Sequence, residues 1–129
     1  MKLRHIHRFA TLLGCATLLS AQAEMPVGDA ERGREVFAAC RTCHYPEKYV
    51  GNHNGPSLFN VFGRKAGSTD FAYYSKTMKA SNLVWTPELL DFWLANPRTF
   101  LKGSTMVTVP MPNPQDRADL IAYLKQFKE

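Results

Sequence analysis

Apolar residues recur at helical spacing between residues 29 and 40, where the pattern predicts the first helix. One face of this helix holds Gly33, Val36, Phe37 and Cys40. Asp29 suits the N-cap, because its side chain can accept a hydrogen bond from a free backbone N–H of the first turn. Glycine inside a helix costs up to about 1 kcal/mol relative to alanine. Gly33 is therefore either a tolerated flaw or, as we favour, a point where another helix crosses closely.

Further helices are predicted in the second half of the chain. They run from Ser75 to Ala80, from Thr86 to just before Pro97, and from Asn113 or Pro114 to about Phe127. The start at Thr86-Pro87-Glu88 is the clearest, since it combines a capping hydroxyl, a proline at the first helical position and an acid in the first turn. No repeat or strand pattern is evident, so the expected class is all-α, with three or four helices and long loops.

Between Tyr45 and Tyr74 the sequence shows no sustained period, and glycine, proline and asparagine interrupt it repeatedly. Structureless stretches of this length are uncommon in compact domains. Leu58, Phe59 and Phe62 make this one too apolar for a disordered segment. A long loop that wraps around a large, flat cofactor accounts for both observations.

The string Cys40-Arg41-Thr42-Cys43-His44 indicates which cofactor this is. A C-x-x-C-H string is typical of c-type haem attachment. Two thiols one helical turn apart can add to the two vinyl groups of a porphyrin, and the next histidine can serve as the proximal iron ligand. A redox dithiol has no use for this histidine, and a zinc site needs more ligands than the chain readily supplies. We therefore expect one haem c, attached through Cys40 and Cys43 and ligated by His44.

The first 23 residues resemble a secretory leader. Three basic residues precede a mostly apolar run over 9–19, and Ala21-Gln22-Ala23 places small residues at the cleavage positions, so cleavage is expected between Ala23 and Glu24. The run is shorter than the roughly 20 residues needed to cross a bilayer. A minor alternative is a lipoprotein signal that ends at Cys15. The predicted organisation is a signal peptide over 1–23 and one periplasmic domain over 24–129.

Removal of this leader changes the charge of the protein. The whole chain carries a net charge of +5, but residues 24–129 hold 13 basic and 11 acidic side chains, which leaves +2. The two propionates of a haem would bring the total close to neutrality. A basic surface for nucleic acid is therefore not supported.

A haem-bound iron also needs a second axial ligand or a vacant site. The candidates outside the attachment string are Met78, Met106, Met111 and His53. Methionine in a core is usually filler, and Met78 lies in a predicted helix, where packing is its more natural role. His53 follows His44 too closely to reach the other face of the ring. Met106 and Met111 remain, both in the proline-rich segment before the last helix.

Several short strings, taken in order, resemble a class I cytochrome c of the compact mitochondrial and α-proteobacterial type, and the resemblance covers nearly all of residues 28–128. They are Cys40 to His44, Gly55-Pro56, Gly63-Arg64-Lys65, Tyr74-Ser75, Trp85, Asn96-Pro97, Gly103-Ser104-Thr105-Met106 and the run from Arg117 to Leu124. The resemblance implies that Met106 is the distal ligand and that the carbonyl of Pro56 holds His44. Met111 stays open as an alternative, because Met111-Pro112 resembles the ligand pair of smaller bacterial relatives.

The same resemblance implies roles for residues away from the iron. The side chains implied to serve the haem propionates are Arg64, Tyr74 and Trp85. Gly33 and Phe37 would cross Tyr123 and Leu120, which agrees with the close contact inferred from the glycine itself. Lys102 stands where the family usually has proline, so a looser ligand loop is expected.

The function expected from these features is that of a soluble, monomeric, periplasmic single-electron carrier. It would cycle between ferric and ferrous haem c and link a quinol-oxidising membrane complex or a dehydrogenase to a terminal oxidase or another acceptor. The alternative is a cytochrome subunit of a periplasmic oxidoreductase complex or a peroxidase-like haem enzyme. Most positions expected around the haem edge are uncharged, with Arg98 and Lys102 as exceptions, so docking of redox partners should depend only weakly on salt.

Overall fold

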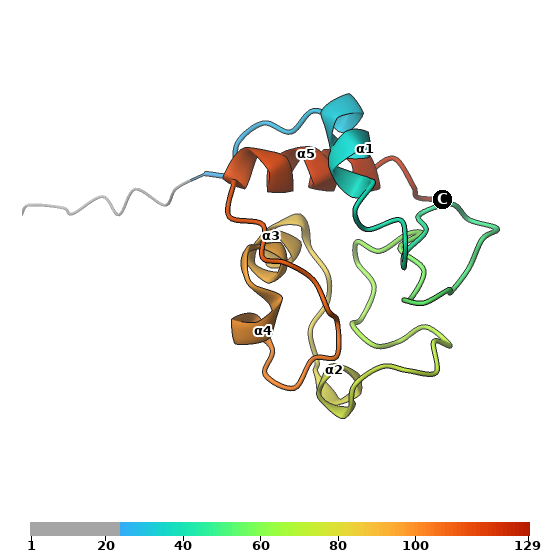
Figure 1. The fold of residues 1–129 in the computed structure, drawn as a ribbon. Helices are drawn as coiled ribbons and strands as arrows, with labels where there is room; N and C mark the ends of the chain where they lie inside the picture. The colour runs from blue at the N-terminus through green and yellow to red at the C-terminus, as the bar shows by residue number, and fades with distance from the viewer. Residues whose placement is uncertain (1–23) are drawn as a thin grey trace, which may run out of the picture.

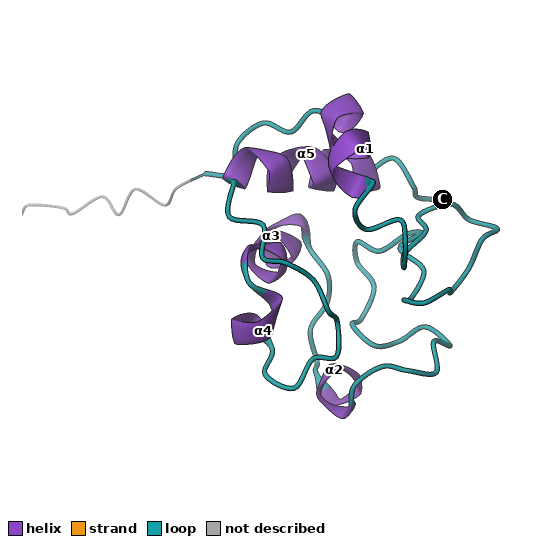
Figure 2. Ribbon diagram, in the orientation of Figure 1, coloured by secondary structure: helices purple, strands orange, loops and turns teal. Residues whose placement is uncertain are grey.

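The computed structural model describes residues 24–129; the predicted leader over 1–23, with Cys15, lies outside them. Within these described residues there are five helices: α1 (Ala30–Phe37), α2 (Lys76–Ala80), α3 (Pro87–Ala95), α4 (Pro97–Phe100) and α5 (Pro114–Leu124). The described part of the chain contains an isolated bridge between Lys65 and Val84 but no strand. The predicted all-α class is therefore confirmed (Figure 2). In Figure 1, α1 and α5 lie together, α3 and α4 lie below them, and long loops occupy the other side of the molecule.

The predicted N-caps account for where four of the helices begin. The side chains of Asp29, Ser75, Thr86 and Asn113 each accept a hydrogen bond from a backbone N–H in the first turn. These bonds satisfy donors that a helix start leaves free. Proline occupies the first position of α3 and α5, where its missing N–H costs nothing.

Two helix ends and one whole helix differ from the prediction. α1 ends at Phe37 rather than Cys40, because the chain then tightens into turns in which the Cys40 N–H donates to the Phe37 carbonyl at 2.8 Å. α5 ends at Leu124, three residues early, and also continues as turns. The segment after Pro97, expected to be irregular, begins with the single turn α4, which Asn96 caps.

α1 and α5 cross with almost no space between their backbones. A Cβ atom placed on Gly33 would lie 2.0 Å from the Asp119 carbonyl oxygen and 2.8 Å from Cβ of Tyr123. The rings of Phe37 and Tyr123 pack beside this point with centroids 5.4 Å apart. The predicted crossing at Gly33 is confirmed. Gly28, to which the sequence alone gave no role, makes a second close approach, because a Cβ atom placed on it would lie 2.1 Å from the Ala118 carbonyl oxygen.

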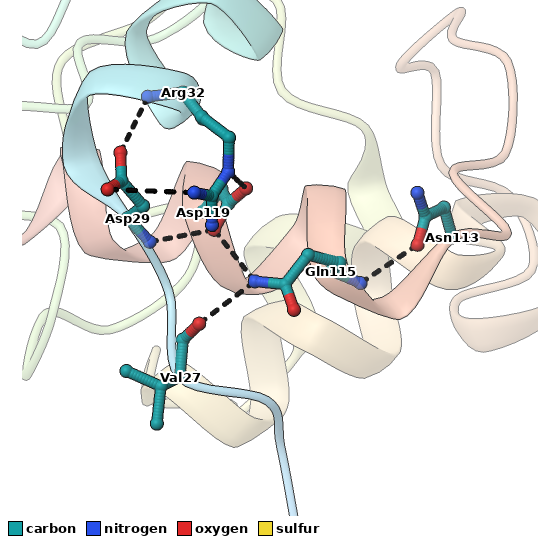
Figure 3. Close-up of polar contacts among 6 residues, drawn as sticks. All are labelled: Val27, Asp29, Arg32, Asn113, Gln115 and Asp119. Atoms are coloured by element: carbon teal, nitrogen blue, oxygen red, sulfur yellow. Dashed lines mark hydrogen bonds and ion pairs between the residues drawn. The ribbon is translucent and has the colours of Figure 1, made fainter.

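A buried carboxylate ties the start of the described chain to α5 (Figure 3). Asp119 is 2 % exposed and accepts from the backbone N–H of Asp29 at 2.7 Å and from Nε and Nη2 of Arg32 at 2.8 and 3.0 Å. Nε2 of Gln115 donates to the same carboxylate at 2.9 Å and to the Val27 carbonyl at 2.9 Å. These contacts, with the Arg32 hydrogen bond foremost, lower the pKa of Asp119 to about 2. The group is therefore ionised and fully paired at neutral pH.

The helices are short, and none among residues 24–129 is long and apolar enough to cross a membrane. Helices of this length depend on tertiary packing for their stability. The buried core provides this packing: Phe37 from α1, Trp93 from α3, and Leu120 and Leu124 from α5 all belong to it. The same four side chains also line a large internal cavity.

Candidate haem-binding site

A cavity of about 580 Å³ lies between the helices and the long loops. Its volume falls in the usual range for ligand sites of about 300 to 1,000 Å³. The wall is mainly apolar. It is contributed by the end of α1 and the attachment string, the loop over 54–75, Met78 of α2, Trp85, helices α3 and α5, and the segment over 104–108. The predicted loop around a large cofactor thus corresponds to a loop around a large cavity.

The attachment string forms one side of this cavity. Cys40, Cys43 and His44 all line it, and both cysteines are free thiols. The turns after α1 bring the three side chains together, since the N–H groups of Cys43 and His44 both donate to the Cys40 carbonyl, at 3.0 and 2.9 Å. Burial raises the pKa of the Cys40 thiol, and the nearby Cys43 raises it further by a smaller amount.

His44 is held in the tautomer that suits a metal ligand. Its Nδ1 lies 2.7 Å from the carbonyl oxygen of Pro56, which can only accept, so Nδ1 carries the proton and Nε2 is left as the free donor atom. Burial lowers the pKa of His44, although the Pro56 hydrogen bond acts the other way. The ring is therefore neutral at neutral pH.

Gly55 shapes the space in which this imidazole lies. A Cβ atom at position 55 would meet Cε1 of His44 at 2.5 Å and Nδ1 at 2.8 Å. The ring cannot move away without breaking its bond to Pro56. Gly55-Pro56 is part of a string that resembles the family, but the sequence alone did not assign a role to the glycine. Its position directly before Pro56, whose carbonyl accepts the hydrogen bond from His44, was the available signal.

Among the residues that the structure describes, two of the four candidates for the second ligand line the cavity and two do not. Met106 lines the cavity, and so does Met78, which is buried in α2 and 8 % exposed. Met111 does not line it; its N–H donates to the Leu94 carbonyl at 3.0 Å and its side chain packs against the core from outside the cavity wall. His53 is exposed, packs on Tyr45 with centroids 5.1 Å apart, and also lies outside the lining.

The three side chains assigned to the propionates all line the cavity as well. Arg64 is held by its own loop, with Nη1 and Nη2 donating to the carbonyls of Phe59 and Ser57 at 2.7 and 2.6 Å. Burial lowers the pKa of Arg64, and the nearby Tyr74 partly offsets this. Trp85 is buried and packs edge-on against Trp93. The structure thus places one fixed cation and two aromatic donors in a mainly apolar wall.

The residues present fit a haem. Two thiols and a neutral imidazole whose Nε2 is free to bind a metal stand on one stretch of wall. A thioether lies on another segment of the same cavity, and the remaining lining is largely apolar. Fold and site together define a small helical protein with a single haem c centre.

The chain also compares closely with known proteins. The sequence model of the family described as Cytochrome c matches residues 30–128. A cytochrome c2 of Rhodomicrobium vannielii is 42 % identical over 113 residues, which cover 88 % of this chain and 90 % of the relative. A cytochrome c of Chlamydomonas reinhardtii is 41 % identical over 109 residues, or 84 % and 97 % of the two chains. The solved structure of cytochrome cH from Methylobacterium extorquens is 39 % identical, with a TM-score of 0.71, covering 77 % of this chain and 99 % of that one.

The chain therefore belongs to the cytochrome c family. Its cofactor is a covalently attached haem c, held through Cys40 and Cys43, and its activity is electron transfer. The predicted class I cytochrome c fold is confirmed by the helical architecture and by this structural neighbour.

Proposed function

We propose that this protein is a periplasmic single-electron carrier between a quinol-oxidising membrane complex or dehydrogenase and a terminal oxidase or other acceptor. The observation that carries the proposal is the chemistry of the cavity wall. Among the described residues that line it, His44 is the only histidine, Arg64 is the only other ionisable nitrogen, and no carboxylate is present. A peroxidase-like enzyme needs groups that move protons beside its reaction site, whereas a carrier needs only fixed ligands and a dry pocket.

In this proposal His44 and Met106 would be the two side chains that hold the iron. The bound haem supplies one reversible electron per cycle, by changing between its ferric and ferrous forms. The Pro56 carbonyl fixes the tautomer and orientation of His44 and makes its Nε2 a stronger donor. A thioether ligand such as Met106, combined with a histidine ligand, would favour the reduced form and raise the potential. Met106 lines the cavity and Met111 does not, which supports this choice. Met78 also lines the cavity, but it is a buried core residue of α2, where packing is its natural role.

The polar part of the wall would hold the propionates. A carboxylate taken out of water needs donors or a countercharge. Arg64 offers its positive charge, which its two bonds to loop carbonyls keep in place. Tyr74 and Trp85 would add neutral donors; the Tyr74 hydroxyl is already positioned by Thr69, with the two oxygens 2.9 Å apart.

The ligand assignment predicts a specific spectroscopic loss. The variant Met106→Ala is expected to lose the weak near-infrared sulfur-to-iron band of the ferric protein and to show a lower reduction potential, because a soft ligand that favours ferrous iron has been removed. Near-infrared absorption and a redox titration measure the two effects. Met111→Ala is the matched control and should leave both nearly unchanged. If the Met111 variant loses the band instead, the ligand has been assigned to the wrong methionine.

The periplasmic location rests on the leader. We expect the exported protein to begin at Glu24, because a basic start, an apolar run and Ala21-Gln22-Ala23 together are typical of a cleaved secretory signal. N-terminal sequencing of protein recovered from the periplasm tests this. A chain that starts at a lipid-modified Cys15 would instead support the membrane-anchored alternative.

A further inference from the structure

The mouth of the haem cavity carries no charged side chain among the described residues. Six of the residues that line the cavity are exposed, and these six form what we call the rim: Ala39, Thr42, Asn54, Tyr73, Thr105 and Val107. They come from the turn after α1, from the middle loop and from the segment before α5. All six rim side chains are therefore uncharged.

Parts of the rim are also strongly apolar. Val107 is 88 % exposed and Tyr73 is 78 % exposed, and Val109, two residues beyond the rim, is 85 % exposed. Tyr73 is no isolated side chain, since its ring packs against Phe71 at 5.7 Å and Phe71 packs edge-on against Tyr74 at 5.2 Å. Large apolar side chains left in water beside a functional cavity mark a surface that another protein covers.

The basic residues that could have surrounded this opening are not part of it. Arg98 and Lys102 are exposed, but neither lines the described cavity, and the same is true of Lys65, Lys76 and Lys79. The lining cation, Arg64, is only partly exposed and is engaged by two carbonyls. A charged partner group that docked at the rim would therefore lose water without gaining a countercharge.

We propose that electron-transfer partners dock on this rim through apolar contact, and that the partner surface around its own redox centre is itself uncharged. The inference rests on the proposed carrier role, and it adds the chemistry of the partner. Complementary charge mainly raises the rate of encounter. Without it, association depends on the apolar area covered, so the rate should be nearly independent of salt.

The test uses the haem-loaded protein in its ferrous form and membranes of the source organism as the oxidant. The rate of oxidation is followed by stopped-flow absorption at ionic strengths from about 10 to 500 mM, a range over which the Debye length falls from about 30 Å to below 8 Å. We expect the rate to change by less than about threefold, against the tenfold or more that is typical of steered encounters.

Two pairs of variants separate apolar docking from charge steering. Val107→Lys and Val107→Asp introduce opposite charges at the rim; Val27→Lys and Val27→Asp make the same changes at a valine that is 92 % exposed and does not line the cavity. We expect both Val107 variants to oxidise more slowly, by roughly fivefold or more, because either charge must be desolvated. Both Val27 variants should behave like the wild type.

The outcomes distinguish this inference from the carrier role itself. Opposite effects of the two Val107 variants, or a rate that falls thirtyfold with salt, would overturn the uncharged rim while leaving the carrier role in place. Equal effects at Val27 and Val107 would show that docking occurs elsewhere. A wild-type protein that the membranes fail to oxidise at any ionic strength would refute the proposed carrier role, and the docking inference with it.

Discussion

The double variant Cys40→Ala/Cys43→Ala should release all of its haem into acidified acetone, whereas the wild-type protein should retain it in the precipitate. The two thiols are the only side chains of the attachment string that can form thioether bonds, and both line the cavity. Without those bonds the cofactor is held only by ligands that acid removes. We also expect this variant to lose most of its helical circular dichroism when the haem leaves, because a cavity of about 580 Å³ would then remain in a small core.

Cys15→Ala is the control for this experiment. Cys15 belongs to the predicted leader, so its replacement should leave attachment intact when the protein is produced in a host with c-type maturation machinery. Haem that leaves the wild-type protein with the solvent would contradict covalent attachment itself.

Gly33→Ala should destabilise the protein by about 2 to 3 kcal/mol, which is within the range found for overpacked cores. The added methyl group would lie 2.0 Å from the carbonyl oxygen of Asp119, which is a backbone atom and cannot rotate away. α1 and α5 must then separate and loosen the contact between Phe37 and Tyr123. The gain of about 1 kcal/mol in helix propensity offsets only part of this loss.

Denaturant unfolding of the haem-loaded protein measures the change. Glu35→Ala, on the exposed side of the same helix, supplies the comparison and should shift the free energy of unfolding by less than about 0.5 kcal/mol. A Gly33→Ala variant as stable as this control would show that the two helices can part at no cost.

The sequence predicted those features that depend on neighbouring residues. Helix starts were predictable because Asp29, Ser75, Thr86 and Asn113 act through bonds two or three residues away. The haem attachment string could be recognised for the same reason, because its five residues are consecutive in the chain. Gly33 could be interpreted because glycine within a helical pattern is costly and needs a reason.

What the sequence could not provide depends on distant parts of the chain. The paired carboxylate of Asp119 binds a backbone N–H 90 positions earlier, and no local pattern indicates such a contact. The choice between Met106 and Met111 was similarly open, since both lie in one irregular segment. Only the fold shows which of the two faces the cavity. α1 ends earlier than predicted because the attachment string folds into tight turns. The spacing of apolar residues continues through these turns and so could not predict where the helix ends.

The crossing of α1 with α5 has a consequence for the order in which the molecule can be assembled. α5 supplies Leu120 and Leu124 to the cavity wall. The helix that packs against α1 therefore also completes one side of the haem cavity. α5 lies at the C-terminal end of the chain, so it can dock only after nearly all of the polypeptide has been made, and closing so long a loop costs entropy. A polypeptide made from its N-terminus therefore presents Cys40 and Cys43 before α5 exists. Until that last helix docks, the two thiols lie in an open chain, where a maturation enzyme can reach them with haem.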